Sequence, residues 1–158
     1  MSGGVDSSVT AALLKERGFD VYGVHIKMWS PMESLRDSTG QADPFFPVCQ
    51  QQHQDRMDAM RVAAALDIPC ATWDFTTEYR EAVVAYMIRE YAAGRTPNPD
   101  VRCNREIKFG IFLKRALAEG ADYVATGHYA RVSDGGRSGM RFLKGVDGNK
   151  DQSYFLWT

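Results

Sequence analysis

The sequence lacks the marks of a membrane protein, a disulfide scaffold and a strongly basic nucleic-acid binder. No apolar run approaches the roughly 20 residues that a membrane-spanning helix needs. Its three cysteines are an odd number and lie far apart, which argues against a disulfide framework. Lys and Arg number 19 against 20 Asp and Glu, so the formal net charge is -1. With no signal-peptide pattern at the N-terminus, these absences predict a cytoplasmic protein without a membrane partner.

The residues that are present predict an α/β fold. Apolar residues make up 44% of the 158 residues and charged residues 25%, an ordinary globular composition. Helical and alternating apolar patterns follow one another along the chain. Helices are predicted around residues 7–17, 59–66, 83–91 and 109–117, strands around 22–28, 71–75 and 123–126, and a hairpin over 130–144. This order predicts a doubly wound parallel sheet of the Rossmann-like kind, with ligands beyond the carboxyl ends of its strands.

Loops and boundaries follow from proline, glycine and polar residues. Residues 30–53 and 95–104 are predicted as loops, and Thr77 as the N-cap of the helix that follows it. Both ends of the sequence look cut, because no strand precedes the glycine-rich start and the last residues stop within an apolar run. We therefore expect residues 1–145 to form one domain that lacks its first strand, and residues 146–158 to begin a connection to further domains.

A glycine-rich segment at residues 2–8, Ser-Gly-Gly-Val-Asp-Ser-Ser, leads directly into the first predicted helix. Gly3 and Gly4 let the backbone approach an anion closely, and the N–H groups and dipole of a helix start favour bound phosphate. Three serine hydroxyls add hydrogen-bond donors. Asp6 suits such a site if a divalent metal bridges it to phosphate oxygens. The alternative is an ordinary helix start capped by Asp6 or Ser7.

A second candidate site surrounds Cys103. Two nearby prolines stiffen the turn before it, which presents Asn98 and Asp100 as polar groups on a rigid segment. Cys103 is expected at the start of the following helix, where the helix dipole and the positive charges of Arg102 and Arg105 would favour the thiolate at neutral pH. The alternative is a buried structural cysteine in a proline turn.

Four sequence blocks carry a resemblance to a known family. The first, Ser-Gly-Gly-Val-Asp-Ser, is the signature of the PP-loop ATP pyrophosphatases, which are adenine nucleotide alpha hydrolase-like enzymes. Together the four blocks, in this order, resemble the tRNA 2-thiouridylase family. They occupy residues 2–7, 94–109, 125–129 and 150–156. The family implies ATP-dependent adenylation of the wobble uridine of tRNAs for Lys, Glu and Gln, followed by sulfur transfer from a protein persulfide to give 2-thiouridine.

The resemblance also implies which residues act. It assigns ATP binding, with Mg²⁺ at Asp6, to Ser2, Gly3, Gly4, Val5, Asp6, Ser7, Met28 and Gly127. It assigns contacts with the target base and the remaining tRNA to Asn98, Pro99, Asp100, Lys150, Asp151 and Gln152. Cys103 would be the nucleophile, and its short sequence distance from Asp100 suggests an acid–base pair. A sulfur-relay protein or cysteine desulfurase would be a partner, and a disulfide bond is a further expectation.

Some alternatives stay open. The family's persulfide cysteine lies in a downstream segment that this sequence does not contain, and neither Cys49 nor Cys70 has that context. We therefore expect no completed sulfur transfer by these 158 residues alone. Two interpretations compete with this one: a PP-loop ATP pyrophosphatase with another acceptor, and an inactive ATP-binding fragment. His128 either binds phosphate or ribose or caps a turn, and His25 is expected to face outward. Five basic residues near the cysteine form either an ordinary charged surface or a tRNA phosphate path: Arg89, Arg95, Arg102, Arg105 and Lys108.

Overall fold

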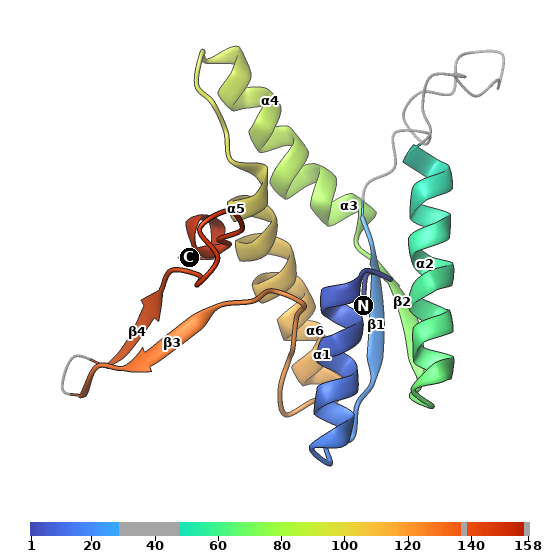
Figure 1. Ribbon diagram of the computed structural model, residues 1–158. Helices are drawn as coiled ribbons and strands as arrows, with labels where there is room; N and C mark the ends of the chain where they lie inside the picture. The colour runs from blue at the N-terminus through green and yellow to red at the C-terminus, as the bar shows by residue number, and fades with distance from the viewer. Residues whose placement is uncertain (29–47, 137–138, 157–158) are drawn as a thin grey trace, which may run out of the picture. The chain divides into compact units, whose positions relative to one another are not determined.

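The computed structural model describes residues 1–28, 48–136 and 139–156, without the side chains of residues 48–52. The chain forms two compact units, Met1–Arg80 and Glu81–Thr158. Helices and parallel strands alternate in the first unit, whereas the second combines helices with an antiparallel hairpin (Figure 1). No helix within the described ranges is long and apolar enough to span a bilayer. The predicted domain boundary at residue 145 stays a prediction.

The first unit is built on a parallel pair of strands. Its elements are α1 (Val5–Glu16), β1 (Gly23–Lys27), α2 (Val48–Ala65), β2 (Cys70–Asp74) and α3 (Thr76–Tyr79). In the register of the pair, Gly23 lies opposite Cys70 and Lys27 opposite Asp74. The α/β class and the parallel pairing are therefore confirmed, in a sheet that has two strands among the described residues.

Apolar burial explains the packing of this unit. Ala59 and Ala63, one turn apart on α2, are buried almost completely, and their small size lets the helix lie close to both strands. Trp73 of β2 is buried too, and its ring meets that of Phe75 edge to face, with centroids 6.3 Å apart. His25, expected to face outward, is buried on β1, and its Nδ1 lies 3.2 Å from the Met1 carbonyl oxygen.

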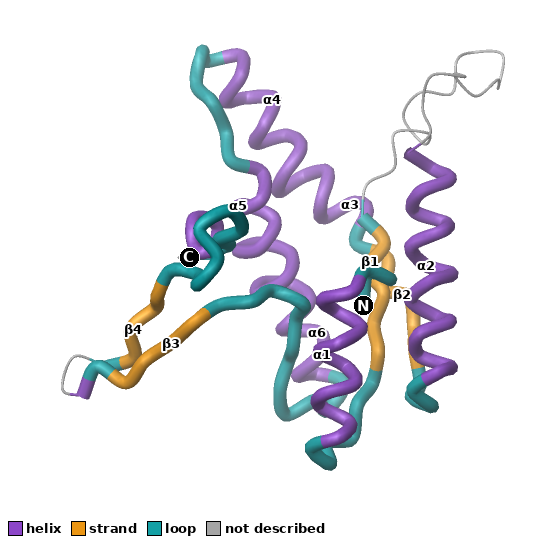
Figure 2. Tube along the Cα trace, in the orientation of Figure 1, coloured by secondary structure: helices purple, strands orange, loops and turns teal. Residues whose placement is uncertain are grey.

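The second unit contains one long helical run and a hairpin. A π-helical turn, η2 (Arg80–Val84), leads into α4 (Ala85–Ala92). The long run comprises α5 (Pro99–Cys103), η3 (Asn104–Phe112) and α6 (Leu113–Ala118), and η3 is again π-helical. The predicted hairpin is confirmed as β3 (Arg131–Asp134) paired with β4 (Met140–Leu143), and η5 (Ser153–Phe155) is a short 3-10 turn. Figure 2 shows this order as helix, strand and loop.

The strand predicted at residues 123–126 is wrong. These residues are loop, and Tyr123 is 80% exposed. An apolar run becomes a strand only when a neighbouring strand satisfies its backbone N–H and C=O groups. In the described chain, this segment is paired with no strand. A short apolar pattern by itself does not supply that partner.

Three helix starts also differ from prediction. Of the predicted loop 30–53, residues 30–47 lie outside the described residues, whereas 48–53 belong to α2. The predicted loop 95–104 ends at Asn98, because Pro99 suits the first helical position, where no N–H is needed. Thr77 is not an N-cap: the helix begins at Thr76, whose N–H donates to the Asp74 carboxylate at 2.9 Å.

Candidate active site

The glycine-rich loop curls around two serine hydroxyls. The N–H of Ser2 donates to the Ser7 hydroxyl at 3.2 Å, and the N–H of Gly4 donates to the Ser2 hydroxyl at 3.3 Å. The two hydroxyl oxygens lie 3.2 Å apart, and that of Ser7 also donates to the Gly4 carbonyl at 3.1 Å. The loop is therefore held in its curled shape by its own polar groups.

The two glycines of this loop have different roles. Gly3 has φ +81°, and a Cβ atom there would lie 2.6 Å from the Asp55 carbonyl oxygen and 2.9 Å from Asp58 Cβ on α2. Gly4 has an extended backbone, and a Cβ atom there would meet only the Ser2 hydroxyl, at 3.4 Å. The fold therefore requires glycine at position 3, whereas the space beside Gly4 is empty apart from the Ser2 hydroxyl.

Helix α1 begins at this loop without a side-chain cap. Gly4 is its N-cap residue and makes no side-chain cap hydrogen bond, so the alternative of a start capped by Asp6 or Ser7 is wrong. The residues of the start are largely exposed, and the first N–H groups of a 12-residue helix lie behind them. This arrangement fits a phosphate group, because both the N–H groups and the helix dipole attract negative charge.

A magnesium ion would have to share its ligands with a substrate. Asp6 is the acidic residue in the first turn of α1. The described residues contain no group of three or more His, Cys, Asp or Glu side chains able to hold a metal ion. Mg²⁺ commonly takes one or two carboxylates together with substrate phosphates and water. Asp6 is therefore suited to be one ligand of a Mg²⁺ ion whose other ligands are phosphate oxygens and water.

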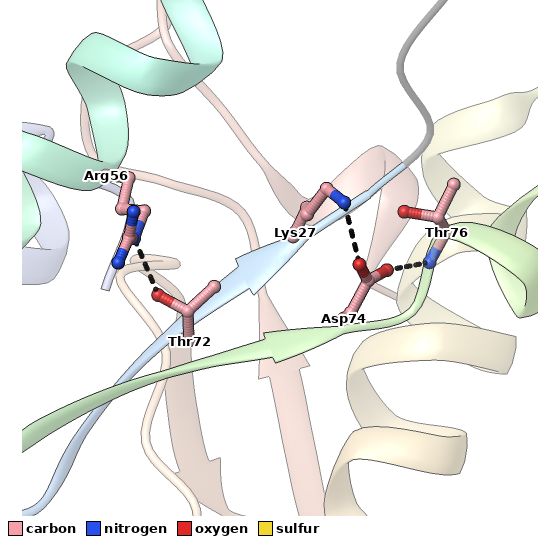
Figure 3. Close-up of polar contacts among 5 residues, drawn as sticks. All are labelled: Lys27, Arg56, Thr72, Asp74 and Thr76. Carbon is pink, nitrogen blue, oxygen red and sulfur yellow. Dashed lines mark hydrogen bonds and ion pairs between the residues drawn. The ribbon is translucent and has the colours of Figure 1, made fainter. Parts of the chain in front are cut away.

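Charged residues end both parallel strands, as Figure 3 shows. Lys27 ends β1 and Asp74 ends β2, and their Nζ and Oδ2 atoms form an ion pair at 2.7 Å. The hydrogen bonds from Lys27 and Thr76 lower the pKa of Asp74 to about 2. Met28, predicted to contact adenosine, follows Lys27 directly at this carboxyl end. This ion pair was not predicted from the sequence, although a charged residue near the end of each of the two predicted strands is a signal for it.

The cysteine turn is organised by a helix cap. The side-chain oxygen of Asn98 accepts a hydrogen bond from the Val101 N–H at 3.1 Å, and Pro99 is the first helical residue. Asn98 and Asp100 are exposed, whereas Cys103 is 8% exposed. Asp100 and Cys103 lie three residues apart on α5, so they are neighbours on one face of the helix.

The expectation of a Cys103 thiolate at neutral pH is wrong for this structure. The helix begins at Pro99, so Cys103 is its fifth residue and lies beyond the first free N–H groups. Burial raises the pKa of the thiol, Lys108 acts against that rise, and Asp100 adds to it. Neither Cys103 nor Cys70 forms a disulfide, so the expected disulfide bond is absent at both.

Two residues predicted to contact tRNA, Asp151 and Gln152, form hydrogen bonds within the second unit. The side-chain oxygen of Gln152 accepts from the Tyr129 N–H at 3.0 Å. The Asp151 carboxylate accepts from the N–H groups of Gly145 and Ser153, both at 3.0 Å, and from the Ser153 hydroxyl at 2.7 Å. The pKa of Asp151 is lowered by these bonds, with the Gly145 N–H as the largest cause. Both side chains thus hold the loop that presents their neighbour Lys150.

One buried side chain links this loop to the cysteine helix. Asn104, which directly follows Cys103, is 1% exposed, and its Nδ2 donates to the Phe155 carbonyl oxygen at 3.0 Å. Gly127 lies in the loop that joins α6 to β3, beside His128. The structure therefore brings the cysteine, the Gly127 loop and the 150–152 segment into one unit, and the glycine-rich loop and Met28 into the other.

A parallel strand–helix–strand unit and an uncapped glycine-rich helix start are features typical of nucleotide-binding α/β domains. The model of the tRNA methyl transferase HUP domain matches residues 1–158, and the chain belongs to this family.

Close relatives share one name. A protein of Nitrosomonas europaea called tRNA-specific 2-thiouridylase MnmA is 53% identical over 158 residues, 99% of this chain and 40% of the relative. Proteins of the same name from Streptococcus mutans and Hydrogenovibrio crunogenus are 52% and 47% identical, over 99% and 100% of this chain and 39% and 38% of their own length. The chain thus spans about 40% of the length of the curated relatives it matches.

Proposed function

We propose that this chain is the ATP-binding and cysteine-bearing part of a tRNA 2-thiouridylase. The observation that carries the proposal is the 47% to 53% identity over practically the whole chain to relatives of that name. ATP, with Mg²⁺ near Asp6, would activate the uracil oxygen at position 2, so that this oxygen leaves as part of AMP. Sulfur from a protein persulfide, supplied by a relay protein or cysteine desulfurase, would replace it.

The first unit supplies the phosphate side of the reaction. The loop from Ser2 to Ser7 would surround the ATP phosphates with serine hydroxyls and with the N–H groups of α1. The open space beside Gly4 supports this assignment, because a phosphate needs close access to the backbone there. Met28, at the carboxyl end of β1, would contact the adenosine, and Gly127 is assigned the same role by the resemblance. This arrangement belongs to a doubly wound sheet, of which β1 and β2 form a part.

The second unit supplies the sulfur side. Asn98, Pro99 and Asp100 are exposed or half-buried on the turn that leads to Cys103, and would hold the target base. Burial raises the pKa of the Cys103 thiol, so catalysis needs a group that removes its proton. Asp100, on the same helix face, is the acid–base candidate. Lys150, on the loop fixed by Asp151 and Gln152, would contact tRNA.

The test uses a protein with the full length of its relatives, incubated with tRNA, ATP and a sulfur donor. Cys103→Ser should keep ATP and tRNA binding but lose 2-thiouridine formation, because serine preserves size and removes the thiolate. Ser7→Ala should instead weaken ATP use. Undiminished thiolation by Cys103→Ser would remove the cysteine from the mechanism.

Two other functions give different results in the same assays. A PP-loop ATP pyrophosphatase with another acceptor would exchange pyrophosphate with ATP but leave tRNA unmodified. An ATP-binding module without turnover would do neither.

A further inference from the structure

The side chain of Lys108 has no part in the function proposed above, yet its position is well defined. Its Nζ lies 3.2 Å from Nε2 of His128, and Nδ1 of the same ring lies 3.0 Å from the Thr126 hydroxyl. An ammonium can only donate, so Nε2 accepts and the ring proton of a neutral imidazole sits on Nδ1. The three residues therefore form a chain in which a neutral histidine holds an ammonium.

The imidazole is itself held in place by aromatic rings. The ring of Phe155 meets it edge to face, with centroids 5.7 Å apart, and the ring of Phe109 lies 6.2 Å away. Burial, with a smaller contribution from Lys108, lowers the pKa of His128. The ring therefore stays neutral at physiological pH and keeps its Nε2 lone pair available to Lys108.

Lys108 lies five residues after Cys103, in the π-helical segment η3 that begins directly after the cysteine. Hydrogen bonds in a π-helix join residues five apart, so residue i+5 lies on the turn that follows residue i and near the same face. Gly110 shows how close such residues come within η3, because a Cβ atom there would lie 2.8 Å from the carbonyl oxygen of Arg105, five residues earlier. Lys108 follows Cys103 by the same five residues. In an α-helix, with about 3.6 residues per turn, it would point to another face.

We propose that Lys108, held by His128, is a positioning residue whose ammonium stabilises the thiolate of Cys103 once the thiol has given its proton to a base, which is Asp100 in the proposed reaction and solvent in the titration below. The proposal rests on the assignment of Cys103 as the nucleophile. Two charged groups act on this thiol, and Lys108 favours its ionised form while Asp100 opposes it. The π-turn would thus offset part of the burial that otherwise keeps the nucleophile neutral.

The test measures the ionisation of Cys103 without ATP or tRNA. Iodoacetamide alkylation of Cys103 is followed by mass spectrometry from neutral to alkaline pH, in the parent chain, Lys108→Met and Lys108→Arg. Lys114→Met is the matched control, because Lys114 is exposed on α6 of the same helical run. We expect Cys103 in Lys108→Met to be alkylated roughly three- to tenfold more slowly than in the parent at neutral pH, the effect of losing a partly screened charge pair. The pH at the midpoint of its alkylation curve should lie higher than in the parent. In Lys108→Arg and in Lys114→Met, the alkylation of Cys103 should depend on pH as it does in the parent.

A parent-like titration of Lys108→Met would overturn the proposal, as would an equal shift in Lys108→Arg, which keeps the charge. If Lys108→Met fails to fold, His128→Leu carries the test, because it removes the acceptor that holds the ammonium and should shift the midpoint in the same direction. No shift in that variant would also overturn the proposal. Alkylation of Cys103 does not require thiolation activity. A failure of the proposed function would therefore appear separately, in the thiolation assay of Cys103→Ser.

Discussion

Replacing Gly3 by alanine tests whether the glycine-rich loop at residues 2–8 is fixed by packing against α2. A residue with a Cβ atom at φ +81° bears a backbone cost of about 1–2 kcal/mol. Its methyl group would also lie 2.6 Å from the Asp55 carbonyl oxygen, so α2 has to shift. Overpacking of this kind typically costs about 1–3 kcal/mol. Together these effects predict a loss of about 2–5 kcal/mol in the free energy of unfolding.

Gly4→Ala is the matched control in the same loop. Its backbone is extended and the nearest atom to a new Cβ is 3.4 Å away. Alanine reduces the freedom of the unfolded chain by about 0.4–1 kcal/mol but is a poorer N-cap residue than glycine by a similar amount. Its stability should therefore stay near that of the parent. Its ATP binding should weaken, because the methyl group would occupy the space proposed for a phosphate.

Urea unfolding followed by circular dichroism gives both stabilities, and nucleotide titration gives ATP affinity. The reasoning fails if Gly3→Ala lies within about 0.5 kcal/mol of the parent, the range of ordinary surface substitutions. It also fails if Gly4→Ala is destabilised as strongly as Gly3→Ala, because the two glycines would then not have separate roles.

The remaining predictions concern two exposed polar groups. The folded-state pKa of Asp74 is lowered from 3.8 to about 2, so its contribution is complete above pH 3.8 and is lost as pH falls through about 2. Because the side chain is half exposed, Asp74→Asn should cost only about 0.5–1 kcal/mol at neutral pH, and urea midpoints of parent and variant should converge towards pH 2. A gap that stays constant with pH would contradict this. Asn98→Ala should lower stability by about 1 kcal/mol in urea unfolding through loss of the cap to Val101, whereas Asn98→Asp, which keeps an acceptor, should not.

Residue patterns over short stretches of the sequence were sufficient to predict much of the fold. Alternation over residues 22–28 and 71–75 predicted β1 and β2, and helical spacing with a following glycine predicted α1. The glycine-rich loop was predicted in the same way, since two adjacent glycines indicate a loop, and Gly3 indeed has a positive φ. These features depend on residues close in sequence, and the comparisons confirm the family that the four blocks indicated.

Tertiary contacts decided what the local pattern could not. Whether residues 123–126 form a strand depends on a partner strand, and whether Cys103 ionises depends on what buries it. The same holds for Lys108 and His128, which lie 20 residues apart in sequence and 3.2 Å apart in space. The sequence alone determined which elements form and which chemical groups are present. Only the tertiary structure decided their burial and partners, because desolvation and long-range hydrogen bonds depend on residues that chain proximity does not bring together.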